Sequence, residues 1–152
     1  MLSRLQHQQE TLKELVADFT EEQLRRRVDP EKWSAFENLA HLAVYQPVFL
    51  TRIERIGKEK DPRFERYVAE QDALFPISLE RGMTDLLREI MQDRALIIAR
   101  LTALDDNDLR RTGLHPRYGP LTLRQWTEFF LLHEAHHLFT IFKLLQDILY
   151  IT

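Results

Sequence analysis

Apolar residues recur along most of the chain at the three- and four-residue spacing that places them on one face of a helix. This pattern predicts four long helices, over about 2–19, 34–57, 78–104 and 122–149. The strict alternation that is typical of strands is hard to find. We therefore expect an all-α fold, a four-helix bundle built as a single domain over residues 1–152.

Short polar motifs mark where several of these helices begin. TEEQ, SAFE and TLRQ, which start at Thr20, Ser34 and Thr122, are capping boxes, in which a hydroxyl accepts a backbone N–H and the fourth side chain reaches back. The first of them predicts a short extra helix directly after the first long one. Ser78 is expected to cap the third long helix, and Pro47 to kink or break the second, because proline removes a backbone hydrogen bond.

Two polar connections separate the predicted helices, over 58–77 and 105–120. The first is charged and carries two prolines and several aromatic residues. A loop of this length in a small domain is often functional. In the second connection, His115 precedes Pro116 and is expected to fix a turn.

Composition excludes several classes of function. The chain contains no cysteine, so disulfides and thiolate metal sites are absent. With a net charge of -3 and a single short basic run at 25–27, it lacks the basic patch of a nucleic-acid-binding protein. No apolar stretch approaches the length of a membrane span, and the N-terminal residues contain no apolar signal segment. We expect a cytoplasmic protein.

The candidate chemistry begins with the segment HEAHH at 133–137. His133 and His137 are four residues apart on a predicted helix, so both project from one face, which they share with Trp126. That face points into the bundle, whereas His136 is expected to face solvent. Two imidazoles at this spacing can reach one divalent ion, or they can be hydrogen-bonded residues of the core.

A third histidine, His41, lies within the second helix at the edge of its apolar stripe and can therefore face the fourth helix. Glu37 and Tyr45, one turn to either side, are the candidate catalytic residues. The Glu37 carboxylate could orient an imidazole or carry a proton, or it could complete the capping box with Ser34. The Tyr45 hydroxyl could lie near the metal, or the ring could simply pack. Arg94 on the third helix could bind an anionic substrate or form a surface ion pair.

The same segment also matches H-E-x-x-H, the zinc-protease pattern. The residues after His137 continue one helix and offer no third ligand within reach, and the chain shows no strand against which a peptide could be held. Glu134 is one residue from His133, so its side chain points about 100° away on the helical wheel. We therefore interpret the segment as a different kind of metal site, with Glu134 beside the metal face or in a structural contact.

Two segments resemble a known family. KWSAFENLAHL at 32–42 resembles the K-W-S-x-x-E-x-L-x-H-L segment of the DinB/YfiT-like superfamily. HPRYGPLTLRQWTEFFLLHEAHHLFTI at 115–141 resembles its H-P-x-x-G-x-L-T-x-x-x-W…H-x-x-H-H segment. The resemblance implies a four-helix bundle in which three histidines hold a divalent metal, at positions that fall on His41, His133 and His137.

The resemblance also implies a range of activities. Family members are associated with zinc, nickel, iron or manganese; some are transferases or isomerases that use a low-molecular-weight thiol, others are proposed hydrolases, and dimers are common. We therefore expect a metal-dependent enzyme that acts on a small molecule, as a homodimer. The alternative is a bundle that serves as a metal-binding or stress-response module without catalysis. The chain has Tyr45 and Gln46 where the family often places acids, and Thr140 where it often has glutamine. These departures affect the surroundings of the metal and the choice of substrate, and not the three histidines.

Overall fold

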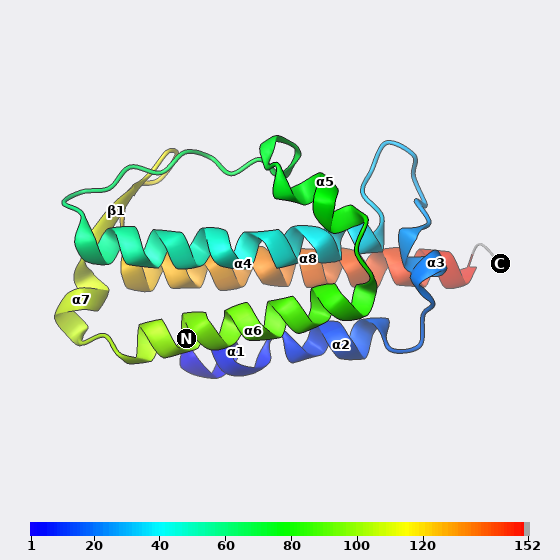
Figure 1. Ribbon diagram of the computed structural model, residues 1–152, viewed down its shortest axis with the longest axis horizontal. Coiled ribbons are helices and arrows are strands. Elements are labelled where there is room, and N and C mark those ends of the chain that lie inside the picture. The colour runs from blue at the N-terminus through cyan, green and yellow to red at the C-terminus, as the bar shows by residue number, and fades with distance from the viewer. Residues whose placement is uncertain (151–152) are drawn as a thin grey trace.

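The predicted four-helix bundle is confirmed in the computed structural model, which describes residues 1–150 (Figure 1). The bundle consists of α4, α6, α8 and a first helix that is split into α1 and α2. In chain order the elements are α1 (Leu2–His7), α2 (Glu10–Val16), α3 (Glu21–Arg25), α4 (Ala35–Lys58), a 3-10 turn (Ala69–Gln71), α5 (Leu74–Leu79), α6 (Met83–Thr102), α7 (Asp106–Arg110), β1 (Thr112–His115), β2 (Gly119–Thr122) and α8 (Leu123–Tyr150).

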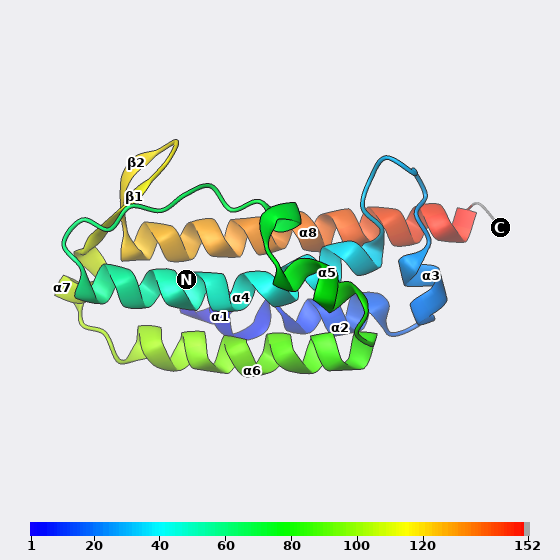
Figure 2. The ribbon, with the colours of Figure 1, turned by 45° about the horizontal axis from the view of Figure 1, so that its top comes forward.

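The direction of the helices explains the long connection between α4 and α6. Both run the same way along the bundle, whereas α8 runs opposite to them (Figure 1). The chain must therefore travel back along the bundle before α6 can start, as in other bundles with a long crossover. Residues 59–82 make this return, and they pass over α4 and α8 rather than closing a tight turn (Figure 2).

The first predicted helix is interrupted at Gln8 and Gln9, which separate α1 from α2. The buried Gln9 side chain is turned into the bundle, where its Nε2 donates to the Gln6 carbonyl at 2.8 Å. Its Oε1 accepts from the Arg94 guanidinium at 3.0 Å. The expected short extra helix is confirmed as α3, which begins with the Thr20 capping box.

The second predicted helix is confirmed as α4, and Ser34 caps it as expected. The helix continues through Pro47 without a break, and the Thr51 hydroxyl donates to the Pro47 carbonyl at 3.0 Å. Proline removes one backbone hydrogen bond from the helix. Because α4 packs along both α6 and α8, these tertiary contacts keep it helical at that point.

The predicted start of the third helix is wrong. Ser78 lies buried within α5, and its hydroxyl donates to the Phe75 carbonyl at 2.6 Å. The long helix α6 starts only at Met83, whose backbone N–H donates to the Glu21 carboxylate at 2.9 Å. Its cap is therefore supplied by a side chain from α3, which a local motif cannot reveal.

The expectation of a chain without strands is also wrong. The second connection forms an antiparallel hairpin of β1 and β2, whose tip is closed by Gly119 with a φ of +72°. The hairpin rises from the bundle beside the start of α8 (Figure 2). At this φ glycine carries no steric cost, unlike residues with a β-carbon.

Backbone contacts tie the hairpin to the first connection. The Leu114 N–H donates to the Pro62 carbonyl at 2.8 Å, and the Leu114 carbonyl accepts from the Phe64 N–H at 3.1 Å. The approach is close, because a β-carbon on Gly113 would lie 2.6 Å from the Phe64 ring. The two polar connections therefore form one wall at the same end of the bundle.

Helix α8 is buried on two sides and exposed along a third. Its side chains Leu131, Leu138 and Leu145 are buried in the bundle. The exposed apolar side chains of α8 include Leu132, Phe139, Phe142 and Leu149. No helix within residues 1–150 is both long and apolar enough to cross a membrane.

Candidate metal centre

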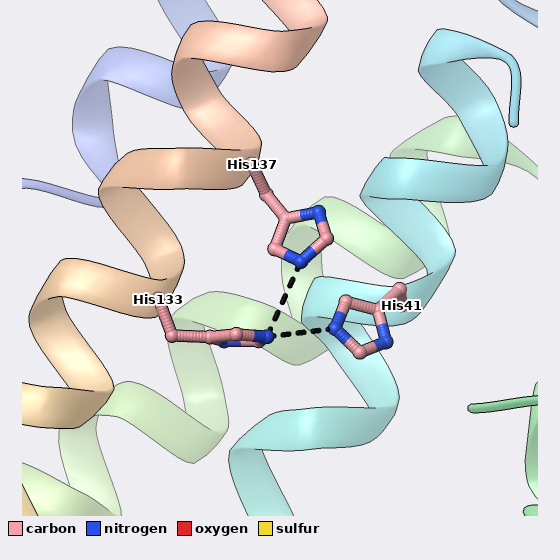
Figure 3. Close-up of side chains that lie close together, drawn as sticks. All are labelled: His41, His133 and His137. Carbon is pink, nitrogen blue, oxygen red and sulfur yellow. Dashed lines mark hydrogen bonds between the residues drawn. The ribbon is translucent and has the colours of Figure 1, made fainter. Parts of the chain in front are cut away.

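The three predicted histidines meet between α4 and α8 (Figure 3). The Nε2 atom of His133 lies 3.0 Å from His41 Nε2 and 3.2 Å from His137 Nε2. Ligand nitrogens around a tetrahedral zinc ion, at bonds of 2.0–2.1 Å, are separated by about 3.3 Å. The distances between these nitrogens are therefore close to those of a group that shares one divalent cation.

Hydrogen bonds alone do not account for this arrangement. In a neutral imidazole, each ring nitrogen has either a proton or a lone pair in the ring plane, so His133 Nε2 cannot donate to both neighbours. The Nδ1 atoms of His41 and His133 are also buried without a hydrogen-bond partner in the described part of the chain. Such burial costs free energy, which coordination through the Nε2 atoms would offset.

Asn38 fixes the orientation of the third imidazole. Its Nδ2 donates to the Ser34 carbonyl at 2.8 Å, which leaves its Oδ1 to accept from His137 Nδ1 at 2.7 Å. A proton on Nδ1 leaves the Nε2 lone pair directed at the other two histidines. Asn38 was not predicted, although a buried asparagine one turn from His41 on the inner face of a helix is a signal that could have found it.

Burial keeps all three imidazoles unprotonated near neutral pH. It lowers the pKa of His41 to about 4, against the opposing effect of Glu70 and Asp72. Burial also lowers the pKa of His133 to about 3 and that of His137 to about 2, and the neighbouring imidazoles lower both further. A metal ligand must be deprotonated, so these side chains are in the state that coordination requires.

A cavity of about 470 Å³ opens on this group. Its walls come from α4, from the crossover, from the tip of the hairpin and from α8. The lining residues are His41, Tyr45, Arg52, Glu65, Arg66, Tyr67, His115, Pro116, Arg117, Tyr118, Phe129 and His133. Part of the long first connection thus borders the candidate metal centre.

Tyr45 lies within the site, between the histidines and Arg52. Its ring centroid is 4.3 Å from that of His133 and 5.8 Å from that of His41. The hydroxyl accepts from Arg52 Nη1 at 2.9 Å. Burial raises the pKa of the phenol, so Tyr45 stays protonated at neutral pH.

Glu37 is placed differently. Its carboxylate accepts from the Ser34 N–H at 2.7 Å and forms an ion pair with Arg27, which confirms the capping interpretation. No hydrogen bond within residues 1–150 joins it to a histidine, and it borders a separate cavity of about 250 Å³. The structure therefore does not bring Glu37 to the candidate metal centre.

Glu134, the glutamate of the H-E-x-x-H pattern, makes the predicted structural contact. It forms a buried ion pair with Arg94, in which both side chains are 1% exposed. Gln8 Nε2 donates to it at 3.0 Å and Gln46 Nε2 at 3.4 Å. The two interpretations offered for Arg94, a substrate-binding residue or a surface pair, are both wrong, because its guanidinium lies in the core.

Two further histidines behave as expected. His115 Nδ1 accepts from the backbone N–H groups of Arg117 and Tyr118, both at 3.1 Å, and so fixes the turn at the hairpin tip. His136 is exposed on the outer side of α8. The three inward imidazoles are therefore distinct from their neighbours in surroundings as well as in spacing.

A comparison with family models matches residues 4–141 to the DinB superfamily. The chain belongs to the DinB superfamily. Among solved structures, this DinB-superfamily chain is similar to YfiT from Bacillus subtilis, described as a probable metal-dependent hydrolase with an unusual four-helix bundle topology. The TM-score is 0.83 at 20% identity, and the match covers 97% of this chain and 85% of YfiT.

A second similar structure is TT2238, described as a four-helix bundle protein, with a TM-score of 0.67 at 19% identity. That match covers 92% of this chain and 94% of TT2238. At these identities the two structures establish the fold of this DinB-superfamily chain and not its reaction. None of the curated proteins compared with the chain matches it in sequence.

The departure at Gln46 has a structural explanation in this member of the superfamily. Gln46 is buried and accepts from Arg94 Nε at 3.2 Å while it donates to Glu134. An amide can serve both partners at once, whereas a second carboxylate would repel Glu134. Gln46, five residues after His41, thus supports the core here.

Proposed function

We propose that the protein is a metal-dependent enzyme that holds a divalent cation through the Nε2 atoms of His41, His133 and His137 and acts on a small molecule. The observation that carries this proposal is the convergence of three neutral imidazoles, of which His41 and His133 line the 470 Å³ cavity. The cavity has the size of a small-molecule site. Zinc, nickel, iron and manganese are the candidate metals that the family resemblance implies, and imidazole ligands favour the first three.

A divalent cation held by these three neutral imidazoles would supply Lewis-acid activation of water, of a thiol or of a carbonyl. The chain's own residues would do the rest. Asn38 holds His137 in the tautomer that presents Nε2. Trp33 and Tyr67 pack around His41 at ring distances of 5.3 and 5.6 Å and shield that side of the site from bulk water.

Hydrolysis is the reaction class that we place first. YfiT, which shares the fold, is described as a probable metal-dependent hydrolase. Tyr45 keeps its proton at neutral pH and could donate a hydrogen bond to a substrate oxygen that faces the cavity. Use of a low-molecular-weight thiol, as well as assembly into a homodimer and a cytoplasmic location, stay predictions.

The metal part of the proposal is tested by elemental analysis of freshly purified protein. We expect about one divalent ion per chain, and we expect His133→Ala and His41→Ala to lose most of it, because each removes one of three ligands. His136→Ala is the matched control, since it removes an exposed imidazole from the same helix. Equal metal content in all four proteins would contradict the proposal.

The catalytic part is tested by turnover of a panel of small esters, amides and lactones by metal-loaded and metal-stripped protein, with and without added thiols. We expect hydrolysis that depends on the metal and is lost in His133→Ala. Turnover only with a thiol would assign the thiol-dependent transferase class instead. Metal binding without turnover of any substrate would favour the binding module.

A further inference from the structure

The wall of the cavity contains a buried arginine that has no acidic partner. Arg52 is 7% exposed, and no aspartate or glutamate side chain within residues 1–150 forms an ion pair with it. Its Nη1 donates to the Tyr45 hydroxyl at 2.9 Å and its Nη2 to the Glu65 carbonyl at 3.3 Å. Both acceptors are neutral, and the guanidinium otherwise faces the aromatic rings of Tyr45, Phe64 and Trp126 at 5.1–5.7 Å, so no negative charge balances it.

Arg94 shows how the same fold treats a buried guanidinium that serves structure. It is paired with the Glu134 carboxylate and bonded to two glutamine side chains. Burying an unpaired charge costs several kcal/mol, so natural proteins pair such groups unless a ligand supplies the counter-charge. Arg52 lacks such an acidic partner, and it lies where the chain borders the cavity.

Arg52 has N–H groups that its two acceptors do not use. A guanidinium has five N–H donors, of which the two neutral acceptors use two. None of its nitrogens is buried without a partner within the described chain, in contrast to the Nδ1 atoms of His41 and His133. The Arg52 side chain therefore retains donors for a further partner, and it lines this cavity as well as a smaller one beside Phe64.

Other charges around the cavity have the same sign. Arg66 and Arg117 also line it, and Glu65 is the single acidic residue among the lining residues. Burial lowers the pKa of His115, and the charges of Arg52 and Arg117 lower it further. The positive charges thus gather at the hairpin-tip side of the cavity, which favours a negatively charged occupant there.

We propose that Arg52 anchors the anionic group, a carboxylate or a phosphate, of a small substrate whose reactive group lies at the three histidines. This inference rests on the proposed function and names its substrate class. A guanidinium fork matches the two oxygens of such a group and can bind both. The Tyr45 side chain spans the gap, with its ring against His133 and its hydroxyl on Arg52. The anionic and reactive groups are therefore separated by about the length of a phenol side chain.

The test uses the chain of residues 1–152, both as purified and after metal removal, with three small phenyl compounds as probes: benzoate, phenyl phosphate and the neutral benzamide. Binding is followed by calorimetry and by tryptophan fluorescence, because the Trp126 ring lies 5.1 Å from the Arg52 guanidinium. We expect at least one of the two anions to bind about 10- to 100-fold more tightly than benzamide, as for hydrogen bonds to a charged group. Comparing the affinities for benzoate and for phenyl phosphate identifies the preferred anion.

The matched variants are Arg52→Gln, Arg52→Lys and Arg63→Gln, the last of which removes an exposed charge from the connection after α4, outside the cavity. We expect Arg52→Gln to abolish the preference for anions, Arg52→Lys to retain part of it, and Arg63→Gln to keep wild-type affinities. Melting temperatures confirm that each variant is folded, and Arg52→Lys, which retains the charge, provides a reading if Arg52→Gln does not fold.

Equal affinities of wild type and Arg52→Gln for both anions, or benzamide binding as tightly as the anions, would overturn the inference. Absence of binding by all three probes would overturn it as well. Anion binding is read in the metal-stripped protein and metal content by elemental analysis, so failure here is distinguishable from failure of the proposed function.

Discussion

The buried pair of Glu134 and Arg94 allows a sharp test of what the H-E-x-x-H segment does in this protein. Glu134→Gln keeps the size of the side chain and removes its charge, which leaves Arg94 buried without a counter-ion. Both side chains are 1% exposed, so solvent cannot compensate for the loss. Breaking such a pair costs about 3–5 kcal/mol. This is a large share of the free energy of unfolding of a small domain, which is roughly 5–15 kcal/mol.

The assay is unfolding in urea, followed by circular dichroism, on protein of known metal content. We expect the midpoint of Glu134→Gln to fall with an unchanged slope. The control is Glu128→Gln, which breaks the exposed pair with Arg4, whose side chains are 36% and 45% exposed. That change should cost about 0–1 kcal/mol. Replacing both buried partners, as Glu134→Leu with Arg94→Met, should restore much of the lost stability, because no unpaired charge then remains.

A decrease of less than about 1 kcal/mol in the free energy of unfolding of Glu134→Gln would refute this reasoning, since an uncompensated buried charge destabilises a protein by more than that. Loss of turnover with unchanged stability would also contradict it. That outcome would return Glu134 to the general-base role of the zinc-protease pattern.

Three other predictions follow from the site and its surroundings. Asn38→Ala removes the acceptor of the His137 N–H, so metal affinity should fall about 10- to 100-fold in competition with a chelator, and unchanged affinity would contradict the assigned role. Burial lowers the pKa of His41 from 6.5 to about 4. Between these values the unfolded chain binds a proton that the folded chain does not, so the stability of metal-free protein should fall as the pH drops below 6.5, by up to about 1.4 kcal/mol per pH unit from this residue. Urea titrations at a series of pH values measure it, and a flat profile would be inconsistent with buried neutral imidazoles. Gly113→Ala places a β-carbon 2.6 Å from the Phe64 ring and should cost about 1–3 kcal/mol in thermal unfolding, whereas an unchanged melting temperature would show that the wall yields freely.

Local signals in the sequence were sufficient for much of the fold. The capping boxes at Thr20, Ser34 and Thr122 are all present, because each joins residues three apart and depends on nothing else. The prediction that Ser78 caps the third long helix was wrong because the start of α6 is capped by Glu21, which is distant in the sequence. The hairpin escaped prediction since its strands are four residues each and its outer contacts are made to the other connection.

The same distinction applies to the candidate site. Helical spacing was sufficient to place His133 and His137 on one face, and the resemblance to the DinB/YfiT-like superfamily added His41 from another helix. The partners of Arg94 and Asn38 lie on other helices, so the burial of the arginine and the role of the asparagine depended on how the helices pack. The cavity was beyond prediction for a related reason, since four separate segments contribute to its walls.

The imidazoles that meet at the candidate centre belong to distant parts of the chain, with His41 and His133 separated by 92 positions. An ion bound there would act as a reversible cross-link between the first and last thirds of the polypeptide. It would bind the folded chain and not the unfolded one, so at a free concentration 1,000 times its dissociation constant it would add about 4 kcal/mol to the free energy of unfolding. Metal supply would then govern the lifetime of the protein as well as its chemistry.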